Sequence, residues 1–372
     1  MLWPICVVAL AFFLRVHRLP SVPFGWHPDE AVKGLLARDL LAGKCCPVFF
    51  SAFTGREALY VYLEAGAFAL FGEGIFAGRL LSAFIGTLTV AFTYALGKTL
   101  FGRQVGLLTA ALLAVSLWHL IASRNGYRAV IQPLVQLPAL WLLFRGWRVA
   151  PDRGRWYFAV AGAFLGLTQY TYTAARAFPV FIAGVVLLAL ILSQSLFLRR
   201  WRSLALMALV AFLVFLPLGI HFYRNPIDFY GRAVQVSVFT PSWAGENPWG
   251  RLWQSIKETA RMFTVWGDPN YRFNVAGRSV FGRVDGALFY IGLLLSLWLA
   301  VRETGLRRLA YVALFLWMGI MLLPMVLSAE GLPYYQRAIG TLPAVYVFPA
   351  LVLSCGLRLA LRIALSKAWL RY

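Results

Sequence analysis

Long apolar runs separated by short polar segments dominate the chain. The runs are continuous rather than alternating between apolar and polar positions, so they predict helices instead of strands. A membrane-spanning helix needs about 17–25 apolar residues, and in lipid a helix satisfies its own backbone hydrogen bonds. We therefore expect an all-α, polytopic membrane protein with about ten transmembrane helices. The expected spans lie near residues 2–17, 79–98, 104–123, 129–147, 156–173, 177–196, 203–221, 285–301, 308–327 and 338–360.

The first of these runs lacks a basic segment before it and a small-residue cleavage site after it, so we expect a retained first helix rather than a removed signal peptide. A further apolar stretch, at 57–71, is about 15 residues long and contains Glu57 and Glu64. It is shorter than a span of about 20 residues. We therefore expect an interfacial or re-entrant helix there.

Composition supports the membrane class. Of 372 residues, 61% are hydrophobic and 13% are charged, whereas soluble chains carry about 25% charged residues. The formal net charge is +21, from 35 Lys and Arg against 14 Asp and Glu. In a soluble protein this excess would suggest nucleic acid. Here the basic residues lie in loops between apolar runs, so we expect anionic lipid headgroups and phosphates as partners and no nucleic acid.

The distribution of charge predicts the orientation in the membrane. With the N-terminus inside, the short cytoplasmic loops are rich in Lys and Arg, as the positive-inside rule requires. The outer side then receives two long loops, at about 18–78 and about 222–284, and twelve of the 14 acidic residues fall in or near this outer set. We expect one transmembrane module over 1–372, with the first outer loop catalytic and no separate soluble C-terminal domain.

An acidic pair follows the first apolar run, in the sequence His27-Pro28-Asp29-Glu30. One interpretation is local: Asp29 caps a helix, Glu30 complements its dipole, and Asp29 pairs with Lys33 four residues on. The other is functional, because acids at a membrane surface are few in this chain and mark sites in membrane proteins.

Four arginines lie on the predicted outer side, against the positive-inside trend: Arg124, Arg128, Arg176 and Arg337. They could bind a phosphate or simply extend to lipid headgroups, and Arg337 could pair with Glu330. His27, His119 and His221 do not cluster, and no zinc or redox motif occurs. We assign no metal site, although a divalent metal is compatible with the sequence, and the redox state of Cys45 and Cys46 stays open.

The order of several motifs resembles the type-C glycosyltransferase superfamily, in the branch of dolichyl-phosphate-mannose protein mannosyltransferases and bacterial aminoarabinose transferases. The residues that carry the resemblance are Asp29-Glu30, Gly55–Leu63 (GREALYVYL), Phe71-Gly72 with Arg79–Ala83 (RLLSA), Ser123–Arg128, Gly267–Asn270 and Tyr335–Gly340. The similarity covers most of the chain. It departs from the family where many relatives have an aspartate after the arginine turn and this chain reads Arg128-Ala129, and where some relatives continue into a large soluble domain beyond position 372.

The resemblance implies transfer of a sugar from a polyprenyl-phosphate carrier on the non-cytoplasmic face of a membrane, here the bacterial inner membrane. By position, Asp29 would be the catalytic aspartate, and outer arginines would hold the lipid phosphate. The acceptor would be a hydroxyl of a protein, a lipid or a glycan.

The chemistry agrees with these residue types. A sugar phosphate has a good leaving group, so the reaction needs a base for the acceptor hydroxyl and cations for the departing phosphate. A glycosidase would need two opposed carboxyls. We expect an inverting transferase with Asp29 as base and Glu30 as an assisting or orienting group. The expected phosphate ligands are Arg124, Arg128, Arg176 and Arg337, and the expected sugar or acceptor contacts are Glu57, Asp268 and Tyr335.

Two other functions remain open from the residues alone. A transporter or lipid flippase would show polar residues near the membrane midplane and often internal repeats, whereas the ionisable residues here lie at the edge. A scaffold that binds anionic lipid would explain the arginines but not the acidic loop.

Overall fold

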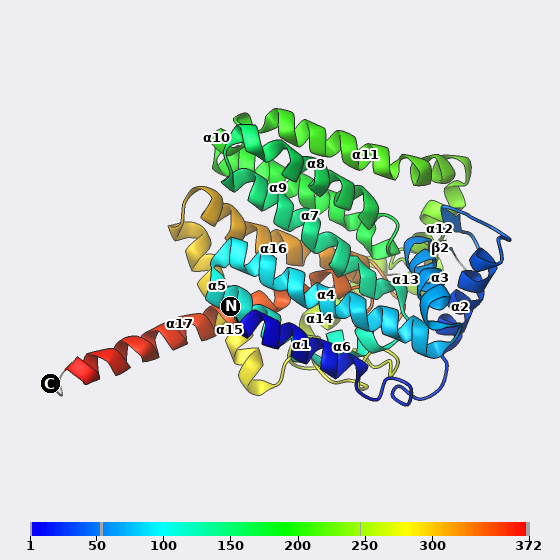
Figure 1. Cartoon of the computed structure of the whole chain (residues 1–372), viewed down its shortest axis with the longest axis horizontal. Coiled ribbons are helices and arrows are strands. Elements are labelled where there is room, and N and C mark those ends of the chain that lie inside the picture. Colours follow the sequence, from blue (N-terminus) through cyan, green and yellow to red (C-terminus); the bar gives the residue numbers. More distant parts are fainter. Residues whose placement is uncertain (1, 53–54, 246, 370–372) are drawn as a thin grey trace.

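The computed structural model describes residues 2–52, 55–245 and 247–369, and nearly all regular structure in them is helical (Figure 1). The longer helices are α4 (Ile75–Phe101), α7 (Ile131–Arg148), α8 (Pro151–Thr168), α9 (Phe178–Leu192), α11 (Trp201–Arg224), α15 (Arg283–Arg302), α16 (Gly305–Val326) and α17 (Leu342–Trp369). The shorter helices are α1 (Leu2–Val16), α2 (Pro28–Leu41), α3 (Leu59–Phe71), α5 (Arg103–Val115), α6 (Leu117–Arg124), α10 (Gln194–Leu198), α12 (Pro226–Val236), α13 (Pro241–Ala244) and α14 (Pro248–Arg261). Single 3-10 turns occur at η1 (Arg128–Val130), η2 (Thr173–Ala177) and η3 (Ile339–Thr341).

The structure confirms an all-α polytopic membrane protein but not the count of ten spans. Within the described residues, seven helical segments are long and apolar enough to cross a membrane. The pair α5 and α6, bent by 59° at Ser116, makes an eighth if it counts as one span. Two of the expected spans are not among these segments. The span at 2–17 corresponds to α1, which has only 15 residues. The span at 156–173 corresponds to α8, which has three charged residues in its first turns.

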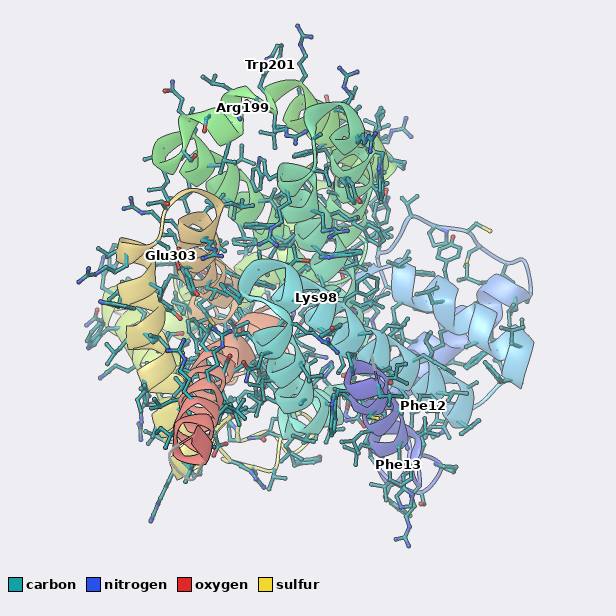
Figure 2. The ribbon with its side chains drawn as sticks, turned by 60° about the vertical axis from the view of Figure 1, so that its left-hand side comes forward. Phe12, Phe13, Lys98, Arg199, Trp201 and Glu303 are labelled. Carbon is teal, nitrogen blue, oxygen red and sulfur yellow. The ribbon has the colours of Figure 1, made fainter. Side chains whose placement is uncertain are left out.

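The helix bundle has two distinct ends. The last turn of α4, with Lys98, and the connections that carry Arg199 and Glu303 lie at the left of Figure 1, the end that comes forward in Figure 2. We call this the basic end, because the predicted cytoplasmic loops lie there. The helices α2, α3 and α12 lie at the opposite end (Figure 1), which we call the site end. The long segment 222–284 is not an open loop, because α12, α13 and α14 occupy much of it.

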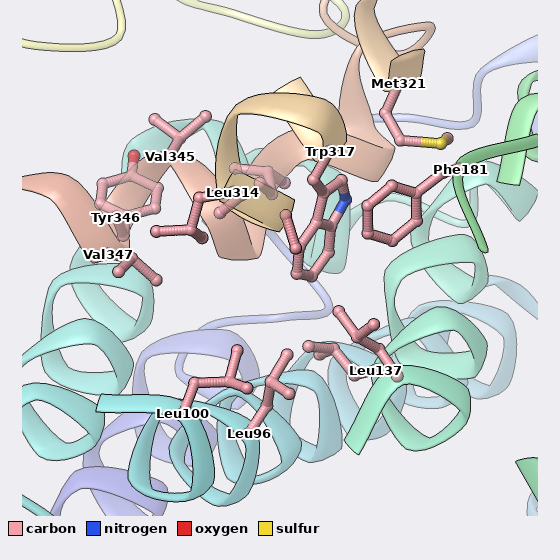
Figure 3. Packing of buried hydrophobic residues seen from close by; sticks show 14 of the residues in the cluster. Leu96, Leu100, Leu137, Phe181, Leu314, Trp317, Met321, Val345, Tyr346 and Val347 are labelled. Atoms are coloured by element: carbon pink, nitrogen blue, oxygen red, sulfur yellow. The ribbon is translucent and has the colours of Figure 1, made fainter. Parts of the chain in front are cut away.

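Small residues allow close helix contacts. A Cβ atom on Gly97 of α4 would lie 2.8 Å from the Cα atom of Gly106 in α5, and one on Gly162 of α8 would lie 2.3 Å from the carbonyl oxygen of Met207 in α11. Such contacts are typical of membrane helices, where packing rather than hydrophobic burial holds helices together. In the core of the bundle, Trp317 of α16 stacks on Phe181 of α9 with ring centroids 5.6 Å apart (Figure 3).

The stretch at 57–71 contains α3, which at 13 residues is shorter than a span, as expected. A two-stranded antiparallel ribbon precedes it, formed by β1 (Phe49–Phe50) and β2 (Arg56–Glu57). Gly55 lies just before β2 with a φ of 80°, and a Cβ atom there would lie 2.8 Å from the ring of Phe49. Glycine is therefore required at the turn that brings Arg56 and Glu57 to the site end.

Candidate active site

The acidic pair lies on the first turn of α2, and His27 rather than Asp29 caps this helix. The His27 side chain accepts a hydrogen bond from the Asp29 N–H (3.1 Å), and the Glu30 carboxylate accepts one from the His27 N–H (3.1 Å). This is a reciprocal capping box, with Pro28 at the first helical position. The local interpretation of Asp29 as the cap is therefore wrong, and the Lys33 ammonium contacts the Asp29 backbone carbonyl rather than its carboxylate.

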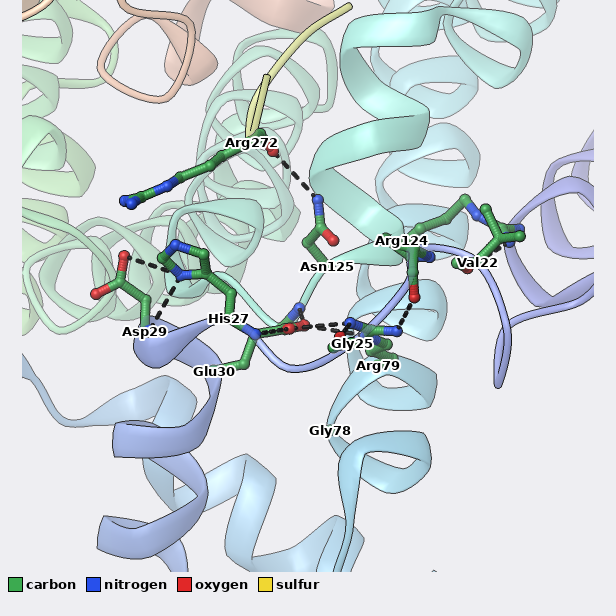
Figure 4. Close-up of polar contacts among 12 residues, drawn as sticks. Val22, Gly25, His27, Asp29, Glu30, Gly78, Arg79, Arg124, Asn125 and Arg272 are labelled. Carbon is green, nitrogen blue, oxygen red and sulfur yellow. Dashed lines mark hydrogen bonds and ion pairs between the residues drawn. The ribbon is translucent and has the colours of Figure 1, made fainter. Parts of the chain in front are cut away.

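His27 leaves the Asp29 carboxylate available to other groups. Because the His27 Nδ1 atom accepts the Asp29 N–H, it carries no proton. Burial lowers the pKa of His27, and the nearby Arg272 adds to this effect, so the ring stays neutral. Its Nδ1 lies 3.6 Å from an Asp29 carboxylate oxygen without donating to it (Figure 4).

Glu30 faces away from Asp29 and connects α2 to α4 and to the turn between α6 and η1. Its carboxylate accepts two hydrogen bonds from the Arg79 guanidinium of α4, at 3.1 and 3.0 Å, and one from the Gly126 N–H at 2.7 Å (Figure 4). Arg79 also donates to the carbonyls of Pro23 and Gly25, both at 2.6 Å. Glu30 is 6% exposed and Arg79 is 2% exposed. This bidentate pair therefore fixes the start of α2 against the bundle.

Arg124 has a similar fastening role. Its guanidinium donates to four backbone carbonyls at the end of α1 and in the loop after it, at 2.7–3.0 Å, and one of these acceptors, Val22, is labelled beside it in Figure 4. Its five N–H groups are thus mostly engaged with the protein itself. Although only four positions separate Arg124 from Arg128, Arg128 lines the cavity beside Asp29 and Arg124 does not.

A cavity of about 400 Å³ opens at the site end, beside the carboxylate of Asp29. Six cationic side chains line it, namely Lys33, Arg56, Arg128, Arg176, Arg232 and Arg337. Asp29 is the one acidic residue among the described lining residues. Apolar and aromatic groups form the rest of the wall, among them Tyr172, Phe229, Val236, Pro324, Leu327 and Tyr334. The cavity therefore suits an anion that carries an apolar chain.

Asp29 is placed to act on a ligand in this cavity. Its side chain is 47% exposed, and one carboxylate oxygen lies 3.8 Å from the Arg56 guanidinium, which is itself 9% exposed. Arg56 enters the cavity from β2 and Asp29 from α2, so the tertiary fold brings this carboxylate and a cation together across the first loop.

Glu57 lies behind two of the cavity arginines. Its carboxylate, 1% exposed, lies 3.2 Å from Arg128 and 3.5 Å from Arg176, and accepts a hydrogen bond from Thr173 at 2.9 Å. Arg128 also lies over the ring of Tyr172, with 5.5 Å to the ring centroid. Glu57 is absent from the cavity lining, so it orients the two guanidinium groups rather than facing a ligand.

Arg337 and Arg232 converge from the other side of the cavity. Both guanidinium groups contact the Glu330 carboxylate, Arg232 at 2.7 Å and Arg337 more closely. Arg337 also donates to the Glu330 carbonyl at 2.8 Å and lies 4.5 Å from the ring centroid of Tyr334. The pairing of Glu330 with Arg337 is thus present, and it leaves Arg337 on the cavity wall.

Asp268 and Tyr335 connect the segment 222–284 to the turn between α16 and η3, and neither residue lines this cavity. The Asp268 carboxylate accepts the Tyr335 N–H at 2.8 Å and the Asn270 N–H at 2.7 Å, and the Tyr335 hydroxyl donates to the Arg278 carbonyl at 2.9 Å. Burial raises the pKa of Asp268 to about 6, and these backbone hydrogen bonds oppose that rise. The neighbours Tyr334 and Gln336, rather than Tyr335, reach the cavity.

Sequence reasoning did not assign Lys33, Arg56 or Arg232 to the site. Arg56 could have been found, because it lies inside the GREALYVYL motif. Lys33 is 3% exposed, and its ammonium lies 5.4 Å from the Tyr127 ring centroid and 6.0 Å from that of Tyr60. Arg232 lies on α12, where no pattern in the sequence distinguishes it from other loop arginines.

The described residues contain no group of three or more His, Cys, Asp or Glu side chains that could hold a metal ion. The four cysteines are free thiols, so Cys45 and Cys46 are not bridged to each other.

Known proteins share both sequence and fold with this chain. Residues 58–221 match the family model of dolichyl-phosphate-mannose-protein mannosyltransferases. An undecaprenyl phosphate-alpha-4-amino-4-deoxy-L-arabinose arabinosyl transferase from Pseudomonas paraeruginosa is 29% identical over 243 residues, which make up 61% of this chain and 42% of that protein. The chain thus spans about two fifths of the length of the curated relatives it matches.

Two solved structures have the same fold. ArnT from Cupriavidus metallidurans, bound to undecaprenyl phosphate, superposes with a TM-score of 0.68 and 18% identity, covering 95% of this chain and 60% of that one. AglB, the archaeal oligosaccharyltransferase from Archaeoglobus fulgidus, was solved with an inhibitory peptide and a dolichol-phosphate. It superposes with a TM-score of 0.61 and 19% identity, covering 98% of this chain and 52% of that one.

Proposed function

We propose that this chain is a member of the type-C glycosyltransferase superfamily, in its aminoarabinose transferase-like branch, and that it transfers a sugar from a polyprenyl-phosphate donor to an acceptor hydroxyl. The observation that carries the proposal is the cavity in which one carboxylate, Asp29, faces six cations and an apolar wall. Sequence relatives are named for an undecaprenyl-phosphate donor, and ArnT was solved with that lipid phosphate bound, which supports the same donor class here.

The donor fits the cavity in two parts. Guanidinium groups bind phosphate oxygens in pairs, so Arg128, Arg176 and Arg337 would hold the phosphate, with Arg56 and Lys33 beside it. The polyprenyl chain would follow the apolar wall formed by residues such as Phe229 and Leu327. Arg124 is left out of this assignment, because its donors already bind backbone carbonyls.

The transfer step needs one base. The Asp29 carboxylate takes the proton of the acceptor hydroxyl as that oxygen forms its bond to the anomeric carbon. The bond from the anomeric carbon to the phosphate oxygen breaks, and the polyprenyl phosphate leaves with the electron pair, stabilised by the arginines. One displacement inverts the anomeric configuration. Glu30 would act as a positioning residue, because its carboxylate is saturated by Arg79, Gly126 and His27.

The site would face the non-cytoplasmic side of a bacterial inner membrane. The basic end carries the Lys and Arg that the positive-inside rule places in the cytoplasm, and the cavity lies at the opposite end of the bundle. The seven or eight apolar helical segments among the described residues already make the chain an integral, multi-pass membrane protein.

A single assay separates this function from its rivals. Purified protein in vesicles would be incubated with a polyprenyl-phosphate sugar labelled in the sugar. Transfer of label to an acceptor, or to water as a slow substitute, supports the proposal. Movement of intact labelled donor across the bilayer without bond cleavage would indicate a transporter or flippase, and retention of the donor alone would indicate a lipid-binding scaffold. Either of those results would overturn the proposal.

Substitution of Arg128 tests the phosphate assignment. A hydrogen bond to a charged group contributes about 1.5–3 kcal/mol, so Arg128→Gln is expected to weaken donor binding roughly 10- to 100-fold. Arg128→Lys should retain part of the affinity, because it keeps the charge but loses the paired geometry. The measurement is equilibrium binding of labelled donor, with Arg38→Gln, exposed on α2, as the matched control. Equal affinity of Arg128→Gln and Arg38→Gln would exclude Arg128 as a ligand.

Donor binding is also expected to depend on pH through Lys33. Burial lowers the pKa of Lys33 to about 7; Glu64 and Asp29 oppose this shift, whereas Arg128 and Arg56 add to it. Lys33 is therefore charged below about pH 7 and loses its charge as the pH rises through that value. A phosphodiester donor keeps its charge over this range. Its affinity should therefore fall about tenfold from about pH 6 to about pH 8, as one charge-assisted contact is lost.

Variants identify the titrating group. Lys33→Arg should bind the donor with a flat pH profile, because arginine stays charged throughout. Lys33→Met should bind weakly at every pH. Burial also raises the pKa of Glu64 to about 8. A fall in donor affinity that persists in Glu64→Gln would therefore exclude Glu64 as the titrating group. A fall in affinity that persists in Lys33→Met would assign the profile to another residue.

A further inference from the structure

A second hollow lies outside the cavity, along the helix α14, which is labelled in Figure 1. We call it the α14 groove. It measures about 520 Å³ and is more open than the cavity. It is lined by Trp243 of α13, by Trp266, by the α14 side chains Arg251, Gln254, Glu258 and Arg261, and by Ala329, Gly331 and Leu332.

The spacing along α14 explains why its polar side chains face one way. Positions 251, 254, 258 and 261 recur at intervals of three and four, so they share one face of the helix. The apolar side chains Trp249, Trp253 and Ile256 form a separate exposed stripe. Such a helix is expected to lie in the membrane interface with its aromatic stripe toward lipid and its polar stripe toward water. The groove therefore opens to the aqueous side of the interface.

Two indole rings stand at the groove and are already held in place. Trp243 is 40% exposed and Trp266 is 49% exposed. The Trp243 indole N–H donates to the Gln235 carbonyl at 2.9 Å. The Trp266 ring packs on Gly277, where an added Cβ atom would lie 2.5 Å from it. A fixed, half-exposed indole offers a flat apolar face at low entropic cost, which is the surface that the C–H face of a pyranose ring covers.

The polar groups of the groove are planar amide, carboxylate and guanidinium groups, which pair with vicinal hydroxyls. Arg251 donates to Gln254 at 2.8 Å and to the Ala329 carbonyl at 3.0 Å, yet its buried Nε atom has no hydrogen-bond partner. These two hydrogen bonds fix the Arg251 guanidinium group at the groove, where the second N–H of each terminal nitrogen can donate to a ligand oxygen. Gln254 and Glu258 supply acceptors beside it.

The charge of the groove distinguishes a sugar from a phosphate. Arg261 pairs with Glu258 at 3.1 Å, which leaves one net positive charge, on Arg251, among the lining residues. The cavity carries six cations against one acid. Phosphate binding favours the cavity, whereas the nearly balanced groove with two indoles favours a neutral, hydroxyl-rich ligand.

The groove and the cavity share a wall. Leu327 and Ser328 line the cavity, while Ala329 and Gly331, directly after them, line the groove. Glu330, between these two pairs, contacts Arg232 and Arg337 of the cavity. We propose that the α14 groove binds a saccharide portion of the acceptor, so that the acceptor is a sugar-containing molecule whose reacting hydroxyl enters the cavity. This inference rests on the proposed function for the acceptor role, but saccharide binding itself does not.

The test uses the full chain, purified in detergent, on an array of immobilised neutral and acidic oligosaccharides. The wild type should bind a subset of the neutral oligosaccharides. Trp266→Ala and Glu258→Gln should each weaken that binding about tenfold or more, as central aromatic and buried polar contacts do. Trp253→Ala, on the opposite face of α14, is the matched control and should bind like the wild type.

Each result separates this proposal from the proposed function. Asp29→Asn should keep its oligosaccharide binding while losing transfer, and Trp266→Ala should keep its affinity for labelled donor. Binding to none of the oligosaccharides, or equal binding by wild type, Trp266→Ala and Glu258→Gln, would overturn the saccharide site. Competition by inorganic phosphate but by no neutral oligosaccharide would also overturn it, because the groove would then be an anion site.

Discussion

Asp29→Asn protein is expected to be produced and folded at wild-type levels but to transfer sugar about 10²- to 10⁴-fold more slowly, the usual contribution of a positioned general base. The physical reason is that asparagine keeps the size of the side chain and cannot take the proton of the acceptor hydroxyl. Because Asp29 makes no short side-chain hydrogen bond among the described residues, and its nearest ionic partner, Arg56, is 3.8 Å away, the change should disturb the fold little.

The measurement is the initial rate with saturating labelled donor, together with donor affinity. Affinity for the donor should change less than the rate, since the substitution leaves the proposed phosphate ligands Arg128, Arg176 and Arg337 in place. Asp39→Asn is the matched control: Asp39 is on the same helix and pairs with exposed Lys44 at 2.9 Å, far from the cavity lining. A transfer rate for Asp29→Asn within about twofold of that control would remove Asp29 from the base role.

The largest expected effect on stability comes from Glu30→Gln. Its partner Arg79 is 2% exposed, so the substitution leaves a buried cation with one carboxylate fewer. Removing one partner of a buried ion pair costs about 3–5 kcal/mol. Thermal unfolding in detergent should show a markedly lower Tm than wild type, and loss of transfer should follow because α2 and Asp29 lose their attachment to α4.

Two further variants test this prediction. The double variant Glu30→Gln/Arg79→Met should recover part of the stability, since no charge is then left buried. Asp39→Asn breaks an exposed pair, which is worth about 0–1 kcal/mol. If Glu30→Gln unfolded at the same temperature as Asp39→Asn, the pair would not be the anchor of the first loop.

The pH dependence of wild-type stability gives a second measure of this anchor. Burial would raise the pKa of Glu30, but hydrogen bonds from Arg79, Gly126 and His27 outweigh it and lower the pKa. A lowered carboxylate pKa contributes stability above the ordinary glutamate value of 4.5 and loses it as the pH falls further. The drop in Tm on acidification below about pH 4.5 should therefore be smaller in Glu30→Gln/Arg79→Met than in the wild type.

The sequence predicted the class of protein from local patterns, and several of the residues that it singled out line the candidate site. Continuous apolar runs sufficient to cross a bilayer require helices, because the bilayer offers no water to the backbone. The expected count of about ten spans was not confirmed, since α1 is short and α8 carries charges at its start. The acidic pair at 29–30 and the arginines at 128, 176 and 337 were recognisable because charged groups are few at the edge of so apolar a chain.

The arginines show where this reasoning stops. Arg124 and Arg128 belong to one short turn and have the same chemistry, yet Arg124 binds the carbonyls after α1 and Arg128 lines the cavity. Glu57, Asp268 and Tyr335 were expected to contact the sugar or acceptor. The structure places them behind the cavity wall or away from it, where they hold other residues in position.

The sequence by itself determined that this chain crosses the membrane repeatedly and that its unusual charges gather at one end. Only the tertiary structure decided which of those charges meet. A membrane helix that is apolar on most sides has no stripe that reveals its neighbours, so the rotation of each such helix, and with it the direction of Arg79 on α4, follows from packing. The contacts that place Asp29 opposite the arginines join segments up to about 300 positions apart, and close packing of the whole bundle selects them.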